Sequence, residues 1–251
     1  MSSRRVIVCL DVKNGRVVKG VRFEGLKDQG DPVELATKAE AAGADEVVFL
    51  DISASQEGRK MLFDVARRTA EQLFIPLTLG GGLGSLDDVN AALRSGADKV
   101  SLNSAIVKRP ALITEVARAV GSQCVVASID AQKEDGRYRV YTHGGKTPTD
   151  LDAIAWAKQC VALGAGEIMV TSIDRDGTRA GYELELTRAI ADAVDVPVIA
   201  SGGAGNAQHL VDAFVKGHAE AALVAGILHD GTTTVGALKA AMAAAGLEVR
   251  S

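Results

Sequence analysis

The chain has 251 residues, of which 47% are hydrophobic and 24% charged, and its formal net charge is −4 at pH 7. This length and apolar content are sufficient for a large buried core and exclude an intrinsically disordered chain. The acidic balance argues against a general nucleic-acid or membrane surface, and no apolar run reaches the roughly 18 residues that span a bilayer.

Short apolar runs rich in β-branched residues recur along the chain, and each is followed by a stretch with helical periodicity. In chain order they are VIVCLD (6–11), EVVFLD (46–51), PLTLGG (76–81), KVSLNS (99–104), CVVASID (124–130), EIMVTS (167–172), PVIASGG (197–203) and AALVAG (221–226). Runs without polar alternation indicate strands buried on both faces, as in parallel sheets. Eight such units predict an α/β fold, a single (β/α)8 TIM barrel domain over residues 1–251. An open doubly wound sheet is less favoured because no GxGxxG follows the first strand.

The chain also repeats itself with a period of about 120 residues. VIVCLDVKNGRVVKG (6–20) resembles VVASIDAQKEDGRYRVYTHGG (125–145), and IPLTLGGG (75–82) resembles VPVIASGGAG (196–205). Such a period predicts a barrel built from two similar half-barrels of four units each.

The three cysteines, Cys9, Cys124 and Cys160, form no CxxC pair and no metal-ligand spacing. Cys9 and Cys124 stand in strand-like runs and are expected to be buried small hydrophobes in a reducing compartment. The apolar part of the N-terminus is too short for a secretory signal. We therefore expect a cytoplasmic protein without a metal site.

The first and fifth predicted strands each end in a carboxylate, Asp11 and Asp130. Catalytic groups of such barrels lie at the C-terminal ends of the strands, and strands four apart face each other across the mouth. Two opposed carboxylates are suited to acid–base catalysis, one donating a proton and the other accepting one. A matched pair favours this role over the simpler one of capping a turn. The pattern does not say which residue is the acid.

Further carboxylates follow the second and sixth predicted strands. Asp51 is equally compatible with binding sugar hydroxyls and with stabilising its loop. In TSIDRDGT (171–178), Asp174 and Asp176 have the same two possible roles, and Gly177 favours binding for Asp176.

Glycine clusters follow the third and seventh predicted strands, and short polar or small residues end the fourth and eighth. Glycine lets backbone N–H groups approach an anion closely, and the start of a helix adds a favourable dipole. The same arrangement twice, half a barrel apart, predicts two phosphate sites and therefore a long bisphosphate substrate. The predicted contacts are Gly82, Asn103 and Ser104 in the first half and Ser201, Gly202, Gly203, Ala225 and Gly226 in the second.

The segment GRVVKGVRFEGLKDQG (15–30) is longer than a normal strand-to-helix loop, which is typical of a lid. Lys19 could reach an anionic substrate from this segment, or it could be a solvated surface lysine.

These features resemble one family over essentially the whole chain, the cyclase (synthase) subunit of imidazole glycerol phosphate synthase from histidine biosynthesis. The most specific segments are CLDVKNGRVVKG (9–20), GDPVELA (30–36), FLDISAS (49–55), GADKVSLN (96–103), GSQCVVASIDA (121–131), TSIDRDGT (171–178) and IASGGAG (199–205). The sugar isomerase of the preceding step shares the repeat and the phosphate sites, but it does not usually carry the first and sixth of these segments. That isomerase, and a non-catalytic phosphate-binding scaffold, are the alternatives.

The resemblance implies an ammonia-dependent lyase that needs no cofactor. Its substrate would be phosphoribulosyl-formimino-aminoimidazole carboxamide ribonucleotide, and its products imidazole glycerol phosphate and aminoimidazole carboxamide ribonucleotide. Asp11 and Asp130 would be the acid–base pair, Lys19 the lid lysine, and the glycine loops the phosphate contacts. A glutaminase (glutamine amidotransferase) subunit, docked at the other face of the barrel, would form a heterodimer with the chain and supply ammonia.

The resemblance also implies a charged gate at the start of the strands, opening into an ammonia channel along the barrel axis. From composition alone its four charged residues would be solvated or paired surface charges. Asp98 and Gln123 match positions near the subunit contact, and Trp156 could lie near that face. The sequence departs from some members at Gly226 (Ser), Ser104 (Thr) and Asn14 (Asp), and phosphate binding should survive the first two changes. The gate residues would be Arg5, Glu46, Lys99 and Glu167.

Overall fold

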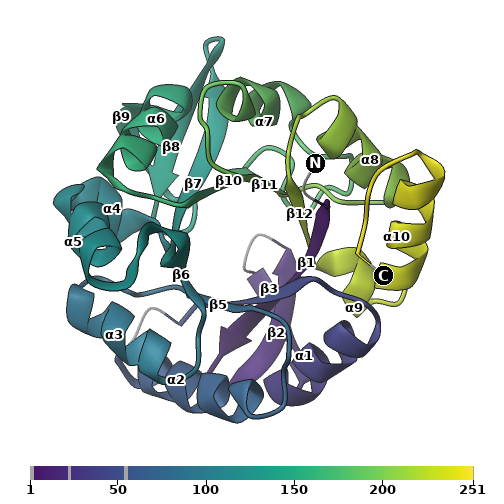
Figure 1. The fold of residues 1–251 in the computed structure, drawn as a ribbon, viewed down its shortest axis with the longest axis horizontal. Coiled ribbons are helices and arrows are strands. Elements are labelled where there is room, and N and C mark those ends of the chain that lie inside the picture. The colour runs from purple at the N-terminus through teal and green to yellow at the C-terminus, as the bar shows by residue number, and fades with distance from the viewer. Residues whose placement is uncertain (1–2, 22–23, 54–55, 251) are drawn as a thin grey trace.

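Eight parallel strands form a closed ring in the computed structural model, which describes residues 3–21, 24–53 and 56–250 (Figure 1). Neighbours in the ring follow chain order, and the pairings of β12 with β1 and of β10 with β7 complete the circle. All eight predicted strands are present, so the closed barrel is confirmed and the open sheet is wrong. The ring contains β1 (Arg5–Lys13), β4 (Glu46–Asp51), β5 (Leu77–Gly80), β6 (Lys99–Leu102), β7 (Val125–Glu134), β10 (Glu167–Ser172), β11 (Val198–Ser201) and β12 (Ala221–Val224).

Helices surround the ring on its outside (Figure 1). The longer ones are α1 (Pro32–Ala41), α2 (Gln56–Ala70), α3 (Leu86–Arg94), α5 (Ala111–Val120), α6 (Ala153–Leu163), α7 (Leu184–Ala191), α8 (Ala207–Val215) and α10 (Val235–Ala244). Short helices α4 (Ser104–Lys108) and α9 (Gly226–His229) follow β6 and β12, and a 3-10 turn, η1 (Ser122–Cys124), precedes β7.

The helix starts repeat in the two halves of the chain. The side chains of Asp31 and Asp152 accept hydrogen bonds from the first-turn N–H groups of α1 and α6. Those of Ser85 and Asn206 do the same for α3 and α8. Each cap satisfies backbone donors that the helix cannot pair internally. The two members of each pair are 121 residues apart, which agrees with the half-barrel repeat.

The segment predicted to be a long loop is instead an antiparallel hairpin. β2 (Arg16–Val21) pairs with β1 and with β3 (Glu24–Gly30). Asn14 and Gly15, with φ of 50° and 71°, turn the chain, which is the preferred pair for a two-residue hairpin turn. Asp135 and Gly136 make the same turn between β7 and β8 (Arg137–Thr142), which pairs with β9 (Thr147–Asp152). The Asn-Gly and Asp-Gly pairs were the sequence signals for these hairpins.

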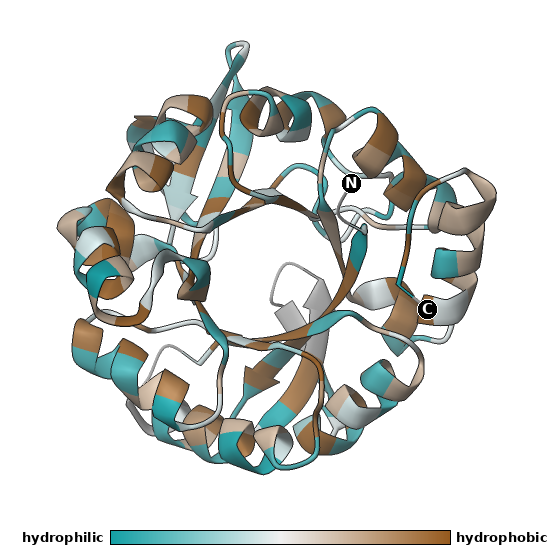
Figure 2. Ribbon diagram, viewed as in Figure 1, coloured by the Kyte–Doolittle hydropathy of each residue, from teal (hydrophilic) through white to brown (hydrophobic). Residues whose placement is uncertain are grey.

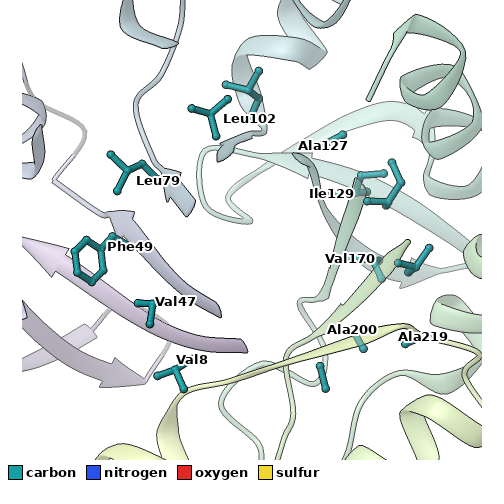
Figure 3. Packing of buried hydrophobic residues seen from close by; sticks show 14 of the residues in the cluster. Val8, Val47, Phe49, Leu79, Leu102, Ala127, Ile129, Val170, Ala200 and Ala219 are labelled. Carbon is teal, nitrogen blue, oxygen red and sulfur yellow. The ribbon is translucent and has the colours of Figure 1, made fainter. Parts of the chain in front are cut away.

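Side chains along each ring strand alternate between two hydrophobic layers. Outward residues such as Val8 and Phe49 pack in the large cluster beneath the helices, part of which Figure 3 shows. Inward residues such as Ile7, Cys9 and Met169 form a separate cluster inside the ring. Figure 2 shows the apolar residues concentrated along the ring strands. Both faces of the strands are therefore buried, which explains their nearly continuous apolar sequence.

Candidate functional site

Asp11 and Asp130 occupy corresponding positions on β1 and β7, which lie four strands apart in the ring. Successive side chains of a strand point to opposite faces. Ile7 and Cys9 belong to the interior cluster, so Asp11, two residues further along, faces the barrel axis. Val126 on β7 belongs to the same interior cluster, so Asp130, four residues further along that strand, also faces the barrel axis. The fold therefore brings both carboxylates to the inner face at the C-terminal mouth of the barrel.

Both carboxyl groups have a raised pKa. Burial, together with the charge of Asp176, raises the pKa of Asp11 to about 7. Burial also raises the pKa of Asp130, and Asn103 counteracts part of this effect, so that the value is about 6. The Asn103 Nδ2 group donates a hydrogen bond of 2.9 Å to Asp130 Oδ2, which favours the ionised form. The two matched residues thus differ in their readiness to hold a proton.

The two candidate aspartates after β10 have different positions. Asp174 accepts hydrogen bonds from the backbone N–H of Lys133 at 2.9 Å and from the side chain of Gln132 at 3.2 Å. It therefore fixes its loop against β7. Asp176 lies close enough to both catalytic candidates for its charge to raise the pKa of each. Of the two, Asp176 faces the site, and Gly177 beside it has a φ of 73°.

Asp51 combines a loop role with an available oxygen. Its side chain is buried at 7% exposure, and Oδ1 accepts a 2.8 Å hydrogen bond from the backbone of Ser53. Oδ2 has no hydrogen-bond partner among the residues described, and the same is true of Asn103 Oδ1. Buried polar atoms are normally paired, so each of these oxygens is a candidate contact for a bound molecule.

The predicted phosphate loops contain glycines that no other residue could replace without rearrangement. Gly81 and Gly203 have φ of 91° and 105°. A Cβ on Gly81 would lie 2.1 Å from the carbonyl oxygen of Asp51, and one on Gly203 would lie 2.2 Å from that of Gly181. Gly82 and Gly202 also have positive φ, so the two loops share the same backbone requirement.

The strands that follow these loops also end alike. Asn103 precedes α4 with φ and ψ of −124° and −94°, and Ala225 precedes α9 with −135° and −78°. Ser104 Oγ accepts a 2.9 Å hydrogen bond from the backbone of His143 in the β8–β9 turn. Together with buried Ser201 on β11, the predicted phosphate residues form two matching backbone arrangements, the first cradle (81–82, 103–104) and the second cradle (201–203, 225–226).

Lys19 lies in β2, where its backbone pairs with Lys27. Its side chain is outside the described part of the structure, so its predicted contact with substrate stays a prediction.

The four predicted gate residues form a closed ring of ion pairs at the start of the strands. Arg5 pairs with Glu46, and its Nη2 lies 2.7 Å from Glu167 Oε1. Lys99 Nζ lies 3.1 Å from Glu46 Oε2 and 2.9 Å from Glu167 Oε2. All four side chains are only 5–16% exposed. Of the two interpretations from composition, solvated or paired surface charges, the structure shows the paired one, and the barrel end buries the four side chains against each other.

The residues predicted near the subunit contact have separate environments. Asp98 accepts a 2.8 Å hydrogen bond from the first N–H of β5, and Glu220 accepts one of 2.9 Å from that of β11. Asp98 therefore supports the sheet itself. Gln123 is exposed in the η1 turn that precedes β7. Trp156, on α6, is 2% exposed and packs in the hydrophobic core, and its expected position near the contact face stays a prediction.

The cysteines follow the prediction in part. Cys9 and Cys160 are buried, and burial raises the pKa of both thiols, that of Cys160 to about 12. Cys124 lies in the η1 turn and is only partly buried. The described residues contain no cluster of His, Cys, Asp and Glu that could hold a metal ion. They also include no helix with the length and apolarity to cross a membrane.

Comparisons with known proteins place nearly the whole chain in one family. A family model described as "Histidine biosynthesis protein" matches residues 5–234. The imidazole glycerol phosphate synthase subunit HisF of Myxococcus xanthus is 67% identical over 251 residues, covering all of this chain and 99% of the relative. The chain belongs to the HisF family. The HisF subunits of Geobacillus thermodenitrificans and Geobacillus kaustophilus are 58% and 57% identical over 252 residues, with both chains fully covered.

Membership of the HisF family confirms the resemblance drawn from the sequence motifs. The names of the HisF relatives describe them as subunits of a synthase, so members of this family work in a multi-subunit enzyme. Within the family's barrel, sequence reasoning missed two features of this chain. Phe74, between α2 and β5, is 92% exposed, and Arg179 extends beside Gly226 of the second cradle. No local pattern distinguishes an exposed Phe74 from a buried one, whereas Arg179 directly follows the TSIDRDGT segment.

Proposed function

We propose that this chain is the cyclase subunit of imidazole glycerol phosphate synthase and performs the ammonia-dependent step of histidine biosynthesis. It converts phosphoribulosyl-formimino-aminoimidazole carboxamide ribonucleotide to imidazole glycerol phosphate and aminoimidazole carboxamide ribonucleotide. The observation that carries the proposal is the opposed pair of raised-pKa carboxylates, Asp11 and Asp130, at the mouth of a barrel of the HisF family.

The environments of the two carboxylates favour different roles. Asn103 stabilises the ionised form of Asp130, which makes Asp130 the general base that takes a proton from the attacking ammonia. Asp11 has the higher pKa and retains a proton more readily, so it acts as the general acid toward the departing nitrogen. The negative charge of Asp176 raises the pKa of both carboxyl groups, which favours the protonated form of Asp11, whereas at Asp130 the hydrogen bond from Asn103 acts in the opposite direction.

The two cradles would hold the two phosphates of the substrate. Their glycines allow backbone N–H groups to approach an anion, and the substrate spans the mouth between them. Asp51, with one buried oxygen that has no partner in the described part of the chain, is suited to a sugar hydroxyl. The proposed contacts are Lys19, Asp51, Gly82, Asn103, Ser104, Asp176, Gly177, Ser201, Gly202, Gly203, Ala225 and Gly226.

The proposed partner is a glutaminase subunit at the end of the barrel that carries the ion-pair ring. Arg5 begins the inward face of β1, and Asp11 ends it. Six residue steps separate them by about 20 Å along the strand. Ammonia released at the ring would reach the carboxylates inside the barrel, shielded from solvent. The three free cysteines fit a reducing cytoplasmic location.

The test is loss of the phosphoribulosyl substrate, followed by absorbance, with the purified chain and ammonium salt at pH 8. Asp11→Asn and Asp130→Asn should each lower turnover by about 10²–10⁴-fold, because each removes one positioned proton-transfer group. Asp150→Asn is the control, since the Asp150 side chain is fully exposed and forms an ion pair with Arg139 on β8.

Three other outcomes would contradict the proposal. Unchanged turnover in both variants would indicate a scaffold without catalytic carboxylates. Turnover of the aminoaldose precursor without ammonia would indicate the sugar isomerase. Absence of turnover by folded chain, even with a glutaminase and glutamine, would reject the cyclase.

A further inference from the structure

The segment that joins β10 to α7, residues 173–183, lies across the second cradle. The Gly181 N–H donates a 2.8 Å hydrogen bond to the carbonyl oxygen of Gly203. The Tyr182 hydroxyl donates one of 2.9 Å to the carbonyl oxygen of Leu223 on β12. A Cβ on Gly205 would lie 2.1 Å from the carbonyl oxygen of Arg179. The segment is thus held in contact with both strands that build the cradle.

Arg179 has a backbone conformation that is uncommon for a residue with a side chain. Its φ of 58° lies in the left-handed region, which costs of the order of 1 kcal/mol and is found preferentially at functional sites. The side chain forms an ion pair with Asp230, which directly follows α9. Arg179 Nη2 lies 3.8 Å from the position that a Cβ on Gly226 would take. The guanidinium is therefore held beside the second cradle.

The guanidinium retains unused hydrogen-bonding capacity. Its Nη2 atom bonds to Asp230, and in the described parts of the chain neither Nε nor Nη1 has a hydrogen-bond partner. The Arg179 side chain is 43% exposed, so a molecule in the mouth can reach it. A guanidinium presents parallel N–H groups that match a phosphate, and such charge-assisted bonds are about twice as strong as neutral ones.

We propose that Arg179 is a phosphate-binding residue of the second cradle and that its guanidinium binds the phosphate at one end of the bisphosphate. This inference rests on the proposed function and adds a guanidinium to the backbone N–H groups of the second cradle. In the first cradle the residue that corresponds to Gly226 is Ser104, whose hydroxyl accepts a hydrogen bond from His143 and can offer a phosphate one neutral donor in place of a cation. Two cradles with the same backbone thus bind the two ends of the substrate with different strength. Asp230 holds Arg179 in place and competes with the phosphate for it.

Titration with inorganic phosphate tests the inference without any turnover. Amide signals of ¹⁵N-labelled chain report the two cradles separately, Gly82 and Ser104 for the first and Gly203 and Gly226 for the second. Arg179→Ala should weaken the phosphate response of the second cradle by about 10- to 100-fold, the effect of losing a bond to a charged group. The response of the first cradle should be unchanged.

The neighbouring carboxylate gives a second variant with the opposite sign. Asp230→Asn removes the competing negative charge but keeps an oxygen for Arg179, so phosphate should bind the second cradle more tightly. If Arg179 served only to anchor the segment through its ion pair, Asp230→Asn and Arg179→Ala would weaken binding alike. That result would overturn the inference.

Kinetics of the ammonia-dependent reaction provide the matching readout. Arg179→Ala should raise the KM for the bisphosphate by about 10- to 100-fold with a much smaller change in kcat, because the contact is made in both ground and transition states. The KM of Arg179→Lys should lie between that of the unmodified chain and that of Arg179→Ala, because lysine keeps the positive charge but lacks the paired N–H groups of a guanidinium. Arg188→Ala is the control, because Arg188 forms an exposed ion pair with Asp192 on α7.

The failures are distinguishable. If inorganic phosphate shifts neither cradle of the unmodified chain, the proposed phosphate sites themselves are wrong. If phosphate shifts both cradles and Arg179→Ala changes neither response, the sites stand and the role of Arg179 is rejected.

Discussion

Asp11 and Asp130 are equivalent in the repeat, yet their surroundings differ at the level of single atoms. Burial is the largest influence on the pKa of both carboxyl groups, and at Asp130 the hydrogen bond from Asn103 counteracts part of it. Such differences in environment divide acid and base roles between two residues of the same type. Cys9, two residues before Asp11, is kept as a protonated thiol because burial and the nearby carboxylates raise its pKa.

Asn103→Ala should move the acidic limb of the pH profile to higher pH. The Asn103 side chain lowers the pKa of Asp130, which burial raises. Without Asn103 the pKa of Asp130 should therefore be higher, and the carboxyl group should ionise at a higher pH. The measurement is kcat/KM between pH 5 and 9, expressed per concentration of free ammonia. An unchanged acidic limb, with only a lower plateau, would contradict the assignment of Asp130 as the base.

Asp11→Asn should stabilise the folded chain while lowering its activity. The pKa of Asp11 is raised on folding, so the native state binds more protons than the unfolded state between about pH 4 and 7. Its ionisation therefore lowers stability as pH rises through this window. The increase in the free energy of unfolding that Asp11→Asn produces should be greater at pH 8 than at pH 5.5, by about 2 kcal/mol. Unfolding midpoints at both pH values check this, and a gain independent of pH would contradict it.

At the scale of elements, the loops after β5 and β11 depend on close backbone approach. The 121-residue repeat places the same glycine requirement in both halves, and the hairpins after β1 and β7 repeat in the same way. The cradles are thus consequences of strand ends that the barrel brings together.

Gly203→Ala and Gly226→Ala should have unequal effects on stability. At Gly203 the φ of 105° and a carbonyl oxygen 2.2 Å from the new Cβ both oppose the change, at a cost of at least about 1–3 kcal/mol. At Gly226 the nearest atom is the Arg179 side chain at 3.8 Å, so the change should stay within about 0.5 kcal/mol. Urea unfolding of both variants provides the comparison. Equal losses would show that the second cradle does not depend on close packing at Gly203.

At the scale of the whole molecule, the two ends of the barrel carry different chemistry on one continuous inner face. The ion-pair ring closes the end where the strands begin, and the carboxylates and cradles occupy the end where they finish. Phe74 precedes β5 and therefore lies at the same end of the barrel as the ion-pair ring. An aromatic side chain that is 92% exposed adds an apolar anchor to the face proposed for the glutaminase.

Phe74→Ala should weaken the glutaminase complex and leave the isolated chain unaffected. Burial of this side chain in an interface contributes about 1.5–3 kcal/mol, so the Kd should rise by about 10- to 100-fold. Glutamine-dependent turnover, titrated with the partner, measures the Kd, and ammonium-dependent turnover of the chain alone should not change. Met61→Ala is the control, because Met61 is 43% exposed but lies within α2, on the outside of the ring of strands. Equal loss in both variants would contradict a specific contact at Phe74.

The sequence by itself determined the eight strands, the barrel, its repeat and the positions of Asp11 and Asp130. These depend on local patterns: runs of apolar residues, glycine clusters and the residue that ends a strand. It did not determine the hydrogen bond between Asn103 and Asp130, the closed ion-pair ring, or the pairing of Arg179 with Asp230. Those contacts join residues from 27 positions apart (Asn103 and Asp130) to 162 positions apart (Arg5 and Glu167), and they depend on which side chains the closed ring of strands turns inward. Only the tertiary structure fixes that geometry, because each contact requires both partners to be buried or positioned by elements that are distant in the chain.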